Sequence, residues 1–399
     1  MLAGLGCLSV LAGAMLGWQS PLMVGGSTPA AASMRTPSPP AVSTGTTDTG
    51  STEAVAPVSV NSEGRARQAR TVTILGVGDI LVHREIIAQA LEDGGGTVDF
   101  RPQLEGIRAL VESADLAVCH VELPMGSREG PWSAWPEPPN APPHLADAVA
   151  ELGFDTCSTA SNHTLDQGMD GVASTLAALD QAGLAHAGSA ANPDDASRPT
   201  IIDVNGVPVA HLSYTYSFNG IPAPHDWCCN LIDPARIVAD AQRARDAGAR
   251  IVVTSLHHGV EGVAEPTALQ QSVVQALADS GQVDLVIGHH AHVVQPVTRV
   301  GTMWVAYGHG NLLSAQSRRD PRSGDGLLTL FTFTEQPDGR FAGTSAVGYA
   351  IVNDDFPFRI RPVGDAETSD ERAEATWTRI EEQALISDDT SGFTLRRFG

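Results

Sequence analysis

Residues 288–292 read Gly-His-His-Ala-His and place two imidazoles in a His-x-His pattern, at His290 and His292. Histidine is the commonest nitrogen ligand for borderline transition metals, so this spacing predicts a pair of metal ligands on a turn after an apolar run. A single triplet of this kind does not by itself establish a metal site. His289 is ambiguous, because the neighbouring histidine can take its place as a ligand.

Four other polar clusters also follow apolar runs directly. They are Gly78-Asp79 with His83, His120 with Glu122, Asn162-His163, and His257-His258. The carboxylates are hard oxygen ligands, and one carboxylate can bridge two cations. Each cluster alone has a simpler interpretation: the carboxylates as helix caps or turn residues, Asn162 as an Asx turn, and His257 as a buried core histidine. Coincidence is a weaker explanation for five such clusters after successive strands than a common site. We therefore expect the five clusters to converge on one sheet edge.

The apolar runs themselves are continuous rather than alternating, which is typical of strands covered on both faces. They span residues 71–75, 116–119, 156–159, 207–216, 251–256, 283–287 and 303–307. Between them, helical spacing of apolar residues predicts one helix over 169–179, ended by Gly183, and another over 266–280, with Pro266 at its first position and Gly281 after it. The alternation of strand and helix predicts an α/β domain.

The composition of the 399 residues excludes several function classes. The formal net charge is −22, so the basic surface that binds nucleic acid or an anionic membrane is missing, and we expect no nucleic-acid partner. All 24 basic residues are arginine. This excludes a P-loop lysine, a Schiff-base lysine and a lysine general base.

The organisation along the chain indicates an exported protein. Residues 1–26 are apolar and resemble a signal sequence or membrane anchor, although a basic n-region is missing. Residues 27–70 are rich in Ser, Thr, Pro, Gly and Ala, which predicts a disordered linker. We expect the main domain over 71–352 and a polar extension over 353–399, with one helix near 369–385. The protein would be extracellular or anchored to the membrane facing the cell exterior; a cytoplasmic protein with an apolar leader is the alternative.

The five cysteines do not form the pattern of a disulfide-stapled scaffold, because their number is odd and the adjacent Cys228-Cys229 pair is hard to bridge. Cys119 and Cys157 can pair if their strands are neighbours. Two small buried core residues are the alternative interpretation.

The motifs after the strands resemble those of the CapA family, capsule-synthesis proteins associated with poly-γ-glutamate capsule formation. Its domain belongs to the metallo-dependent phosphatase superfamily, which implies an α/β/β/α sandwich. The resemblance runs in the right order from about residue 72 to 351. It is carried by residues 78–83, 114–116, 121–124, 161–166, 214–216, 219–222, 256–261, 287–293, 307 and 310–311.

The resemblance implies a site for two divalent metal ions, which would be manganese, iron or zinc. The implied ligands are Asp79, His83, Glu122, Asn162, His257, His290 and His292, with Glu122 or Asp79 bridging the ions. His163 would protonate a leaving group or steady a developing oxyanion. The implied chemistry is two-metal hydrolysis, in which the ions activate water and stabilise the charge that develops.

The sequence departs from the family pattern at four motifs. The usual Asn-Leu-Glu is His-Val-Glu at 120–122, His-Trp-Gly is His-His-Gly at 257–259, a proline is Ala291, and Ser-Leu-Gly-Asn is Gly-His-Gly-Asn at 308–311. These changes add imidazoles without removing an expected ligand. We expect the residues behind the ligands or near the substrate to be His120, His258, His289, His309 and Asn311.

Three functions remain open at this point. The first is a dinuclear-metal hydrolase that cleaves a phosphoester or amide bond of a cell-envelope polymer of the poly-γ-glutamate type. The second is a non-catalytic scaffold subunit of a membrane polymer-synthesis complex, in which metal serves stability. The third is a metal-dependent peptide epimerase, against which an export signal argues because peptide maturation usually takes place inside the cell.

Overall fold

The computed structural model describes residues 69–134, 136–365, 370–386 and 389–399, all within one compact unit, Arg65–Gly399. The predicted leader and almost all of the predicted linker lie outside the described residues. No helix among the described residues is long and apolar enough to cross a membrane.

The larger sheet has nine strands, and its central strand β1 pairs in parallel with β2 and antiparallel with β12. The parallel part contains β1 (Thr71–Ile80), β2 (Leu116–Val121), β3 (Thr156–Ser158), β4 (Ala185–Ala187) and β11 (Asn311–Leu313), which pairs with the end of β1. The remaining strands are β12 (Asp325–Glu335), β13 (Phe341–Asp355), β14 (Phe358–Pro362) and β15 (Phe393–Arg396).

The second sheet has six strands, of which the four central ones run parallel. In spatial order they are β5 (Thr200–Val204), β6 (Val207–Thr215), β7 (Ile251–His258), β8 (Leu285–His290), β10 (Met303–Ala306) and β9 (Val297–Val300).

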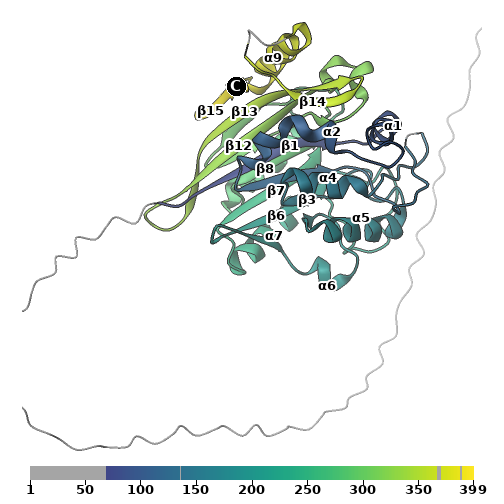
Figure 1. Cartoon of the computed structure of the whole chain (residues 1–399). Helices are drawn as coiled ribbons and strands as arrows, with labels where there is room; N and C mark the ends of the chain where they lie inside the picture. Colours follow the sequence, from purple (N-terminus) through teal and green to yellow (C-terminus); the bar gives the residue numbers. More distant parts are fainter. Residues whose placement is uncertain (1–68, 135, 366–369, 387–388) are drawn as a thin grey trace, which may run out of the picture. The chain divides into compact units, whose positions relative to one another are not determined.

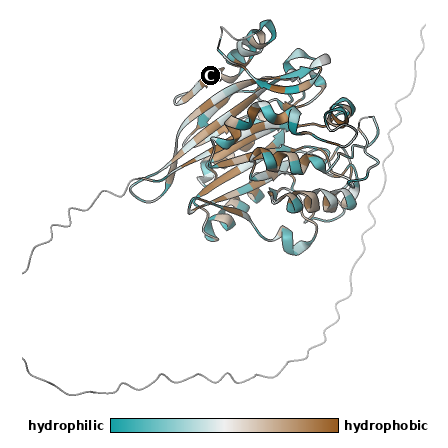
Figure 2. Cartoon of the chain, viewed as in Figure 1, coloured by the Kyte–Doolittle hydropathy of each residue, from teal (hydrophilic) through white to brown (hydrophobic). Residues whose placement is uncertain are grey.

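The two sheets pack face to face, with helices on both outer faces (Figure 1). A cluster between the sheets joins Ile74 and Phe331 of the larger sheet to Val253, Ile287 and Trp304 of the second. The larger sheet is covered by α1 (Arg84–Asp93), α2 (Arg101–Leu104), η1 (Glu105–Ile107), α3 (Arg108–Glu112), α4 (His144–Leu152) and α5 (Gly168–Ala182), and the second by α7 (Pro234–Asp246) and α8 (Ala268–Ser280). Figure 2 shows the apolar residues concentrated along the strands. The expected α/β class and α/β/β/α layering are confirmed.

The predicted strands and helices are present with shifted ends. Gly183 and Gly281 follow α5 and α8 with φ of 79° and 63°, the left-handed conformation that ends a helix at glycine. Pro266 does not occupy the first position of α8. Thr267 is the N-cap instead and forms a capping box with Gln270: its hydroxyl accepts the backbone N–H of Gln270, and the Gln270 side chain accepts the backbone N–H of Thr267.

The residues after 352 belong to the same folded unit, because the expected boundary falls inside β13. β14 and β15 pair with β13, and the predicted helix near 369–385 is α9 (Glu371–Ala384). Ala373 and Ile380 of α9 join the cluster between the sheets. The remaining short elements are α6 (Pro193–Ala196), η2 (Gln316–Arg318) and η3 (Pro321–Gly324).

Cys119 and Cys157 form a disulfide, since β2 and β3 are parallel neighbours and place the two residues in register. Their Cα atoms are 4.4 Å apart. Cys228 and Cys229 are free and buried. The sulfur bridge therefore ties together the two strands that lead to Glu122 and Asn162.

Candidate metal centre

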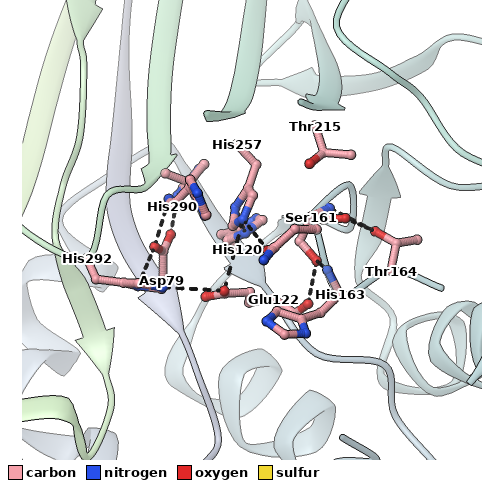
Figure 3. Close-up of polar contacts among 12 residues, drawn as sticks. Asp79, His120, Glu122, Ser161, His163, Thr164, Thr215, His257, His290 and His292 are labelled. Atoms are coloured by element: carbon pink, nitrogen blue, oxygen red, sulfur yellow. Dashed lines mark hydrogen bonds and ion pairs between the residues drawn. The ribbon is translucent and has the colours of Figure 1, made fainter. Parts of the chain in front are cut away.

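The predicted ligands meet where strands from both sheets end. β1, β2 and β3 of the larger sheet lead to Asp79, Glu122 and Asn162. β7 and β8 of the second sheet end at His257-His258 and His290. Figure 3 shows Asp79, Glu122 and His257 pointing toward a common centre. The convergence predicted for one sheet edge therefore takes place across two sheets.

Asp79 is fully buried and joins the sheets through its carboxylate. Its Oδ1 accepts a hydrogen bond from Nδ1 of His289 at 2.9 Å, and its Oδ2 accepts one from the backbone N–H of His290 at 2.9 Å. Burial alone would raise the pKa of Asp79, but hydrogen bonds from His289 and His292 hold this pKa well below its ordinary value. The preceding Gly78 is required for space, because a Cβ there would lie 2.3 Å from the carbonyl oxygen of Gly310.

Glu122 is 1% exposed, and neither carboxylate oxygen has a hydrogen-bond partner among the described residues. The nearest ring nitrogens to Oε1 are Nε2 of His292 at 3.6 Å and Nε2 of His257 at 4.0 Å. Burial raises the pKa of Glu122 to about 7. Because a buried carboxylate without partners is costly, both oxygens fit the coordination of a cation.

His292 lies between the two carboxylates. Its Nδ1 is 2.9 Å from Oδ1 of Asn311 and 3.2 Å from Oδ2 of Asp79, so the ring turns Nε2 toward Glu122. Burial alone would lower the pKa of His292, but the charges of Glu122 and Asp79 raise it to about 10. The centre therefore favours a positive charge, which a divalent cation would also supply.

The turn after β8 has unusual backbone geometry. His290 and His292 have φ of 85° and 53°, in the left-handed region that residues other than glycine rarely adopt. The His290 ring packs against Tyr216, with ring centroids 4.6 Å apart, and its Nδ1 has no partner among the described residues. Burial lowers the pKa of His290 to about 4, so the ring is neutral, as a metal ligand must be.

His257 and Asn162 contact each other through Nε2 and Oδ1, which are 2.8 Å apart. Asn162 donates from Nδ2 to Oδ1 of Asn219 at 3.3 Å, and this bond turns its own Oδ1 toward His257. The amide oxygen thus faces the centre, as the Asn162 prediction requires.

Three groups of side chains have ligand atoms within 4.8 Å of one another. They are Asp79–His120–His257, Asp79–Glu122–His292 and Glu261–His290–His292. Asp79 and His292 each belong to two of these groups. Among the described residues His83 belongs to none of these groups; its Nδ1 lies 3.0 Å from the carbonyl oxygen of Leu81 and 3.3 Å from the backbone nitrogen of Ala315.

His163 stands beside the centre with an acidic partner. Its Nδ1 donates to Oδ2 of Asp166 at 2.6 Å, and its backbone N–H donates to the hydroxyl of Ser161 at 3.0 Å. Burial alone would lower the pKa of His163, but the hydrogen bond to Asp166 and the charge of Glu122 raise it. The ring can therefore hold a proton at the wall of the pocket described next.

A pocket of ≈ 910 Å³ opens onto the centre. Its lining includes His83, Asn162, His163, Tyr216, Asn219, Glu261, His292, Arg84 and Arg319. Arg84 pairs with Glu137 at 3.1 Å, whereas the side chain of Arg319 has no ion-pair partner among the described residues. The pocket wall thus includes a cationic side chain that has no ion-pair partner among the described residues.

The additional histidines lie deeper than the pocket. His258 and His309 are buried, and their ring nitrogens have no hydrogen-bond partner among the described residues. Burial lowers the pKa of each to about 3. His289 orients Asp79 and Asn311 orients His292, so both hold ligand candidates in place, as expected for residues behind a metal site.

Sequence reasoning missed four residues that position the centre. They are Ser158, Asp166, Asn219 and Glu261. The last three lie inside the motifs that carry the family resemblance, so the sequence contained a feature that could have identified them. No sequence feature identifies Ser158, because a serine within a short buried strand is not distinctive.

The chain is similar to proteins of capsule biosynthesis. It is 28% identical over 274 residues to "Capsule biosynthesis protein CapA" of Bacillus anthracis, covering 66% of this chain and 64% of that protein. It is 29% identical over 199 residues to "PGA biosynthesis protein CapA" of Bacillus subtilis, covering 49% and 51%. The chain thus spans less than two thirds of the length of these relatives.

Among solved structures, the calcineurin-like phosphoesterase YfkN from Bacillus subtilis matches with a TM-score of 0.44 and 14% identity, covering 79% of this chain and 97% of that one. This similarity is too low to assign a function, and the layered fold rests on the two sheets themselves. The model of the family described as "Bacterial capsule synthesis protein PGA_cap" matches residues 73–316. Because this match spans more than half of the chain and includes every ligand candidate from Asp79 to His292, the chain belongs to that family.

Proposed function

We propose that this protein is a dinuclear-metal hydrolase of cell-envelope polymer biosynthesis, acting on a phosphoester or amide bond in a polymer of the poly-γ-glutamate type. The observation that carries the proposal is Glu122, a buried carboxylate whose two oxygens lack partners among the described residues and lie next to Asp79 and His292. The names of the relatives supply the substrate class. They do not supply the reaction.

The residues that would hold the ions are Asp79, Glu122, Asn162, His257, His290 and His292. When bound, two divalent ions would supply Lewis-acid activation of water and stabilise developing negative charge. His163 would donate a proton to the leaving group from Nε2, while Asp166 holds its Nδ1. Arg319 would bind an anionic group of the polymer at the pocket wall.

Export and an extracellular or membrane-anchored location are part of the proposal. The Cys119–Cys157 disulfide supports this location, because disulfides persist in oxidising compartments and are rare in the cytosol. A membrane polymer-synthesis complex would be the partner, with the polymer itself as substrate.

The test combines metal content with hydrolysis. The purified protein would be loaded separately with manganese, iron and zinc, its bound ions counted, and its hydrolysis of a chromogenic phosphoester and of γ-glutamyl oligomers measured. His163→Ala should lower hydrolysis at least about 100-fold with unchanged metal content. His186→Ala is the matched control, since His186 pairs with the exposed Asp180 away from the centre. Full metal occupancy without hydrolysis of any substrate would favour the scaffold function instead.

A further inference from the structure

His120 lies at the candidate metal centre but is not one of the predicted ligands. It lies on β2 in register with Asp79 on β1, and its ring is fully buried beside His257. The family motif has asparagine here, and this chain has an imidazole. His120, Asp79 and His257 each offer one ligand atom within 4.8 Å of the others.

The orientation of the His120 ring is fixed by Ser158. The Ser158 hydroxyl is 2.7 Å from Nδ1, and this contact directs Nε2 toward Nδ1 of His257 at 3.0 Å. The His120 ring also stacks on His289, with ring centroids 4.1 Å apart. A side chain held on one nitrogen while the other faces a cluster of ligands is typical of metal-binding histidines.

The separation of the two facing nitrogens suits one shared ion. Imidazole nitrogens bind zinc at about 2.0–2.1 Å, so two such ligands of one ion lie about 2.9–3.4 Å apart for angles between 90° and the tetrahedral value. Nε2 of His120 and Nδ1 of His257 have this separation. The fully buried Asp79 then provides the oxygen of the same group and, through its second group with Glu122, a link to the other ion.

We propose that His120 is a direct ligand of one of the two metal ions, sharing it with Asp79 and His257. This inference rests on the dinuclear centre proposed above and assigns that ion two imidazoles. Nitrogen ligands favour zinc, iron and cobalt over manganese, so an imidazole at His120 shifts the metal preference of this ion in that direction.

The competing arrangement is a hydrogen-bond relay from Ser158 through His120 and His257 to Asn162. In this arrangement His120 only positions His257. The two roles differ in how strongly metal binding depends on His120. Loss of a residue behind a ligand lowers affinity about 10–100-fold, and loss of a ligand should lower it further.

The experiment measures ion binding in the full chain, with Zn²⁺ and Mn²⁺ affinities by calorimetry and the visible spectrum of the Co²⁺ form. His120→Asn restores the family residue, and His258→Asn is the control, since His258 is equally buried but belongs to none of the three groups. We expect His120→Asn to lower the Zn²⁺ affinity of one ion more than 100-fold, to lower Mn²⁺ affinity much less, and to change the Co²⁺ spectrum. His258→Asn should leave the spectrum unchanged.

Ser158→Ala provides a second measurement that does not depend on the folding of His120→Asn. It leaves the imidazole in place but frees its orientation, and we expect a loss of Zn²⁺ affinity of about 10–100-fold. Equal, small losses in His120→Asn and His258→Asn with an unchanged Co²⁺ spectrum would overturn the inference and leave the dinuclear centre intact. A wild-type chain that binds none of these ions would overturn the proposed function as well.

Discussion

Asp79 on β1 and His289 on β8 are joined by a 2.9 Å hydrogen bond that links the two sheets at the candidate metal centre. Both residues are buried, and the second Asp79 oxygen accepts from the backbone of His290. The same carboxylate belongs to two of the three groups of ligand candidates. The contact therefore serves both the packing of the sheets and the placement of a ligand.

Replacing His289 should test this double role. His289→Leu leaves the Asp79 carboxylate buried with one partner fewer, and a hydrogen bond to a charged group contributes about 1.5–3 kcal/mol. We expect the free energy of unfolding to fall by that amount in urea denaturation, and metal affinity to fall about 10–100-fold. His186→Leu, which removes an exposed contact to Asp180, should change neither quantity appreciably. Unchanged stability in His289→Leu would contradict the role of the contact.

Glu122→Gln should have opposite effects on the chelator-treated and metal-loaded protein. The wild-type carboxylate is buried with no hydrogen-bond partner among the described residues, so removing its charge should raise the free energy of unfolding after chelation by at least about 1 kcal/mol. The same change should weaken metal binding. Thermal unfolding with and without chelator measures both effects, and Glu382→Gln, at an exposed position of α9, is the control. If Glu122→Gln were less stable than wild type after chelation, the buried charge of Glu122 would not destabilise the metal-free protein.

His211 should make folding sensitive to acid. The ring is buried between the sheets, with Nδ1 2.9 Å from the hydroxyl of Thr156 and Nε2 3.0 Å from that of Ser255. Burial lowers its pKa to about 3 from an ordinary 6.5. Between these values the unfolded chain binds a proton that the folded chain does not, so this residue lowers stability as the pH falls below 6.5, by at most about 1.4 kcal/mol per pH unit.

Denaturation of wild type and His211→Gln between pH 7.5 and about pH 4 isolates this contribution. The variant should be less stable than wild type at pH 7.5 and the difference should narrow as the pH falls. Parallel pH profiles for the two proteins would contradict a lowered pKa at this position. Comparing the two proteins removes the contribution of the other buried histidines, which both contain.

The disulfide should contribute to stability across β2 and β3. Cys119 and Cys157 are separated by 38 residues, and closing a loop of this length contributes about 2–4 kcal/mol. We expect the Cys119→Ala, Cys157→Ala double variant to lose that amount in urea denaturation. Wild type treated with reductant should approach the variant, while the variant itself should not respond to reductant. No difference between oxidised and reduced wild type would contradict the bridge.

Arg319 should select anionic substrates. Its guanidinium lines the pocket, and no ion-pair partner for it exists among the described residues. If the proposed hydrolase acts on a carboxylate-bearing polymer, Arg319→Gln should raise KM about 10-fold with little change in kcat, since this contact is equal in ground and transition states. Arg340→Gln, an exposed arginine on the turn between β12 and β13, is the control. An unchanged KM would remove Arg319 from substrate binding.

Much of the fold and the location of the site could be predicted from the sequence. Continuous apolar runs indicate buried strands, and Gly183 and Gly281 mark the ends of helices because their left-handed conformations favour glycine. The polar clusters after the strands do converge, although across two sheets and not on one sheet edge. These features depend on local residue order, which the sequence states directly.

The features that could not be predicted depend on contacts between residues that are distant in the sequence. The histidines at 289, 290 and 292 have different roles because the backbone at His290 and His292 turns into the left-handed region, which residue type does not indicate. β14 and β15 are short and partly polar, so only their pairing with β13 shows that they belong to the sheet. His83 shows a related limit: the motif predicts it as a ligand, and the structure places it in the pocket wall with its Nδ1 beside the backbone of Leu81 and Ala315, so its role as a ligand stays a prediction.

The division of the ligand candidates between two sheets has a consequence for how the protein matures. Neither sheet alone carries a full set: Asp79, Glu122 and Asn162 come from one, and His257, His290 and His292 from the other. A chain with only half of its sandwich assembled therefore lacks a complete centre. Metal uptake would report that both halves have come together, and a captured ion would lock them in that arrangement.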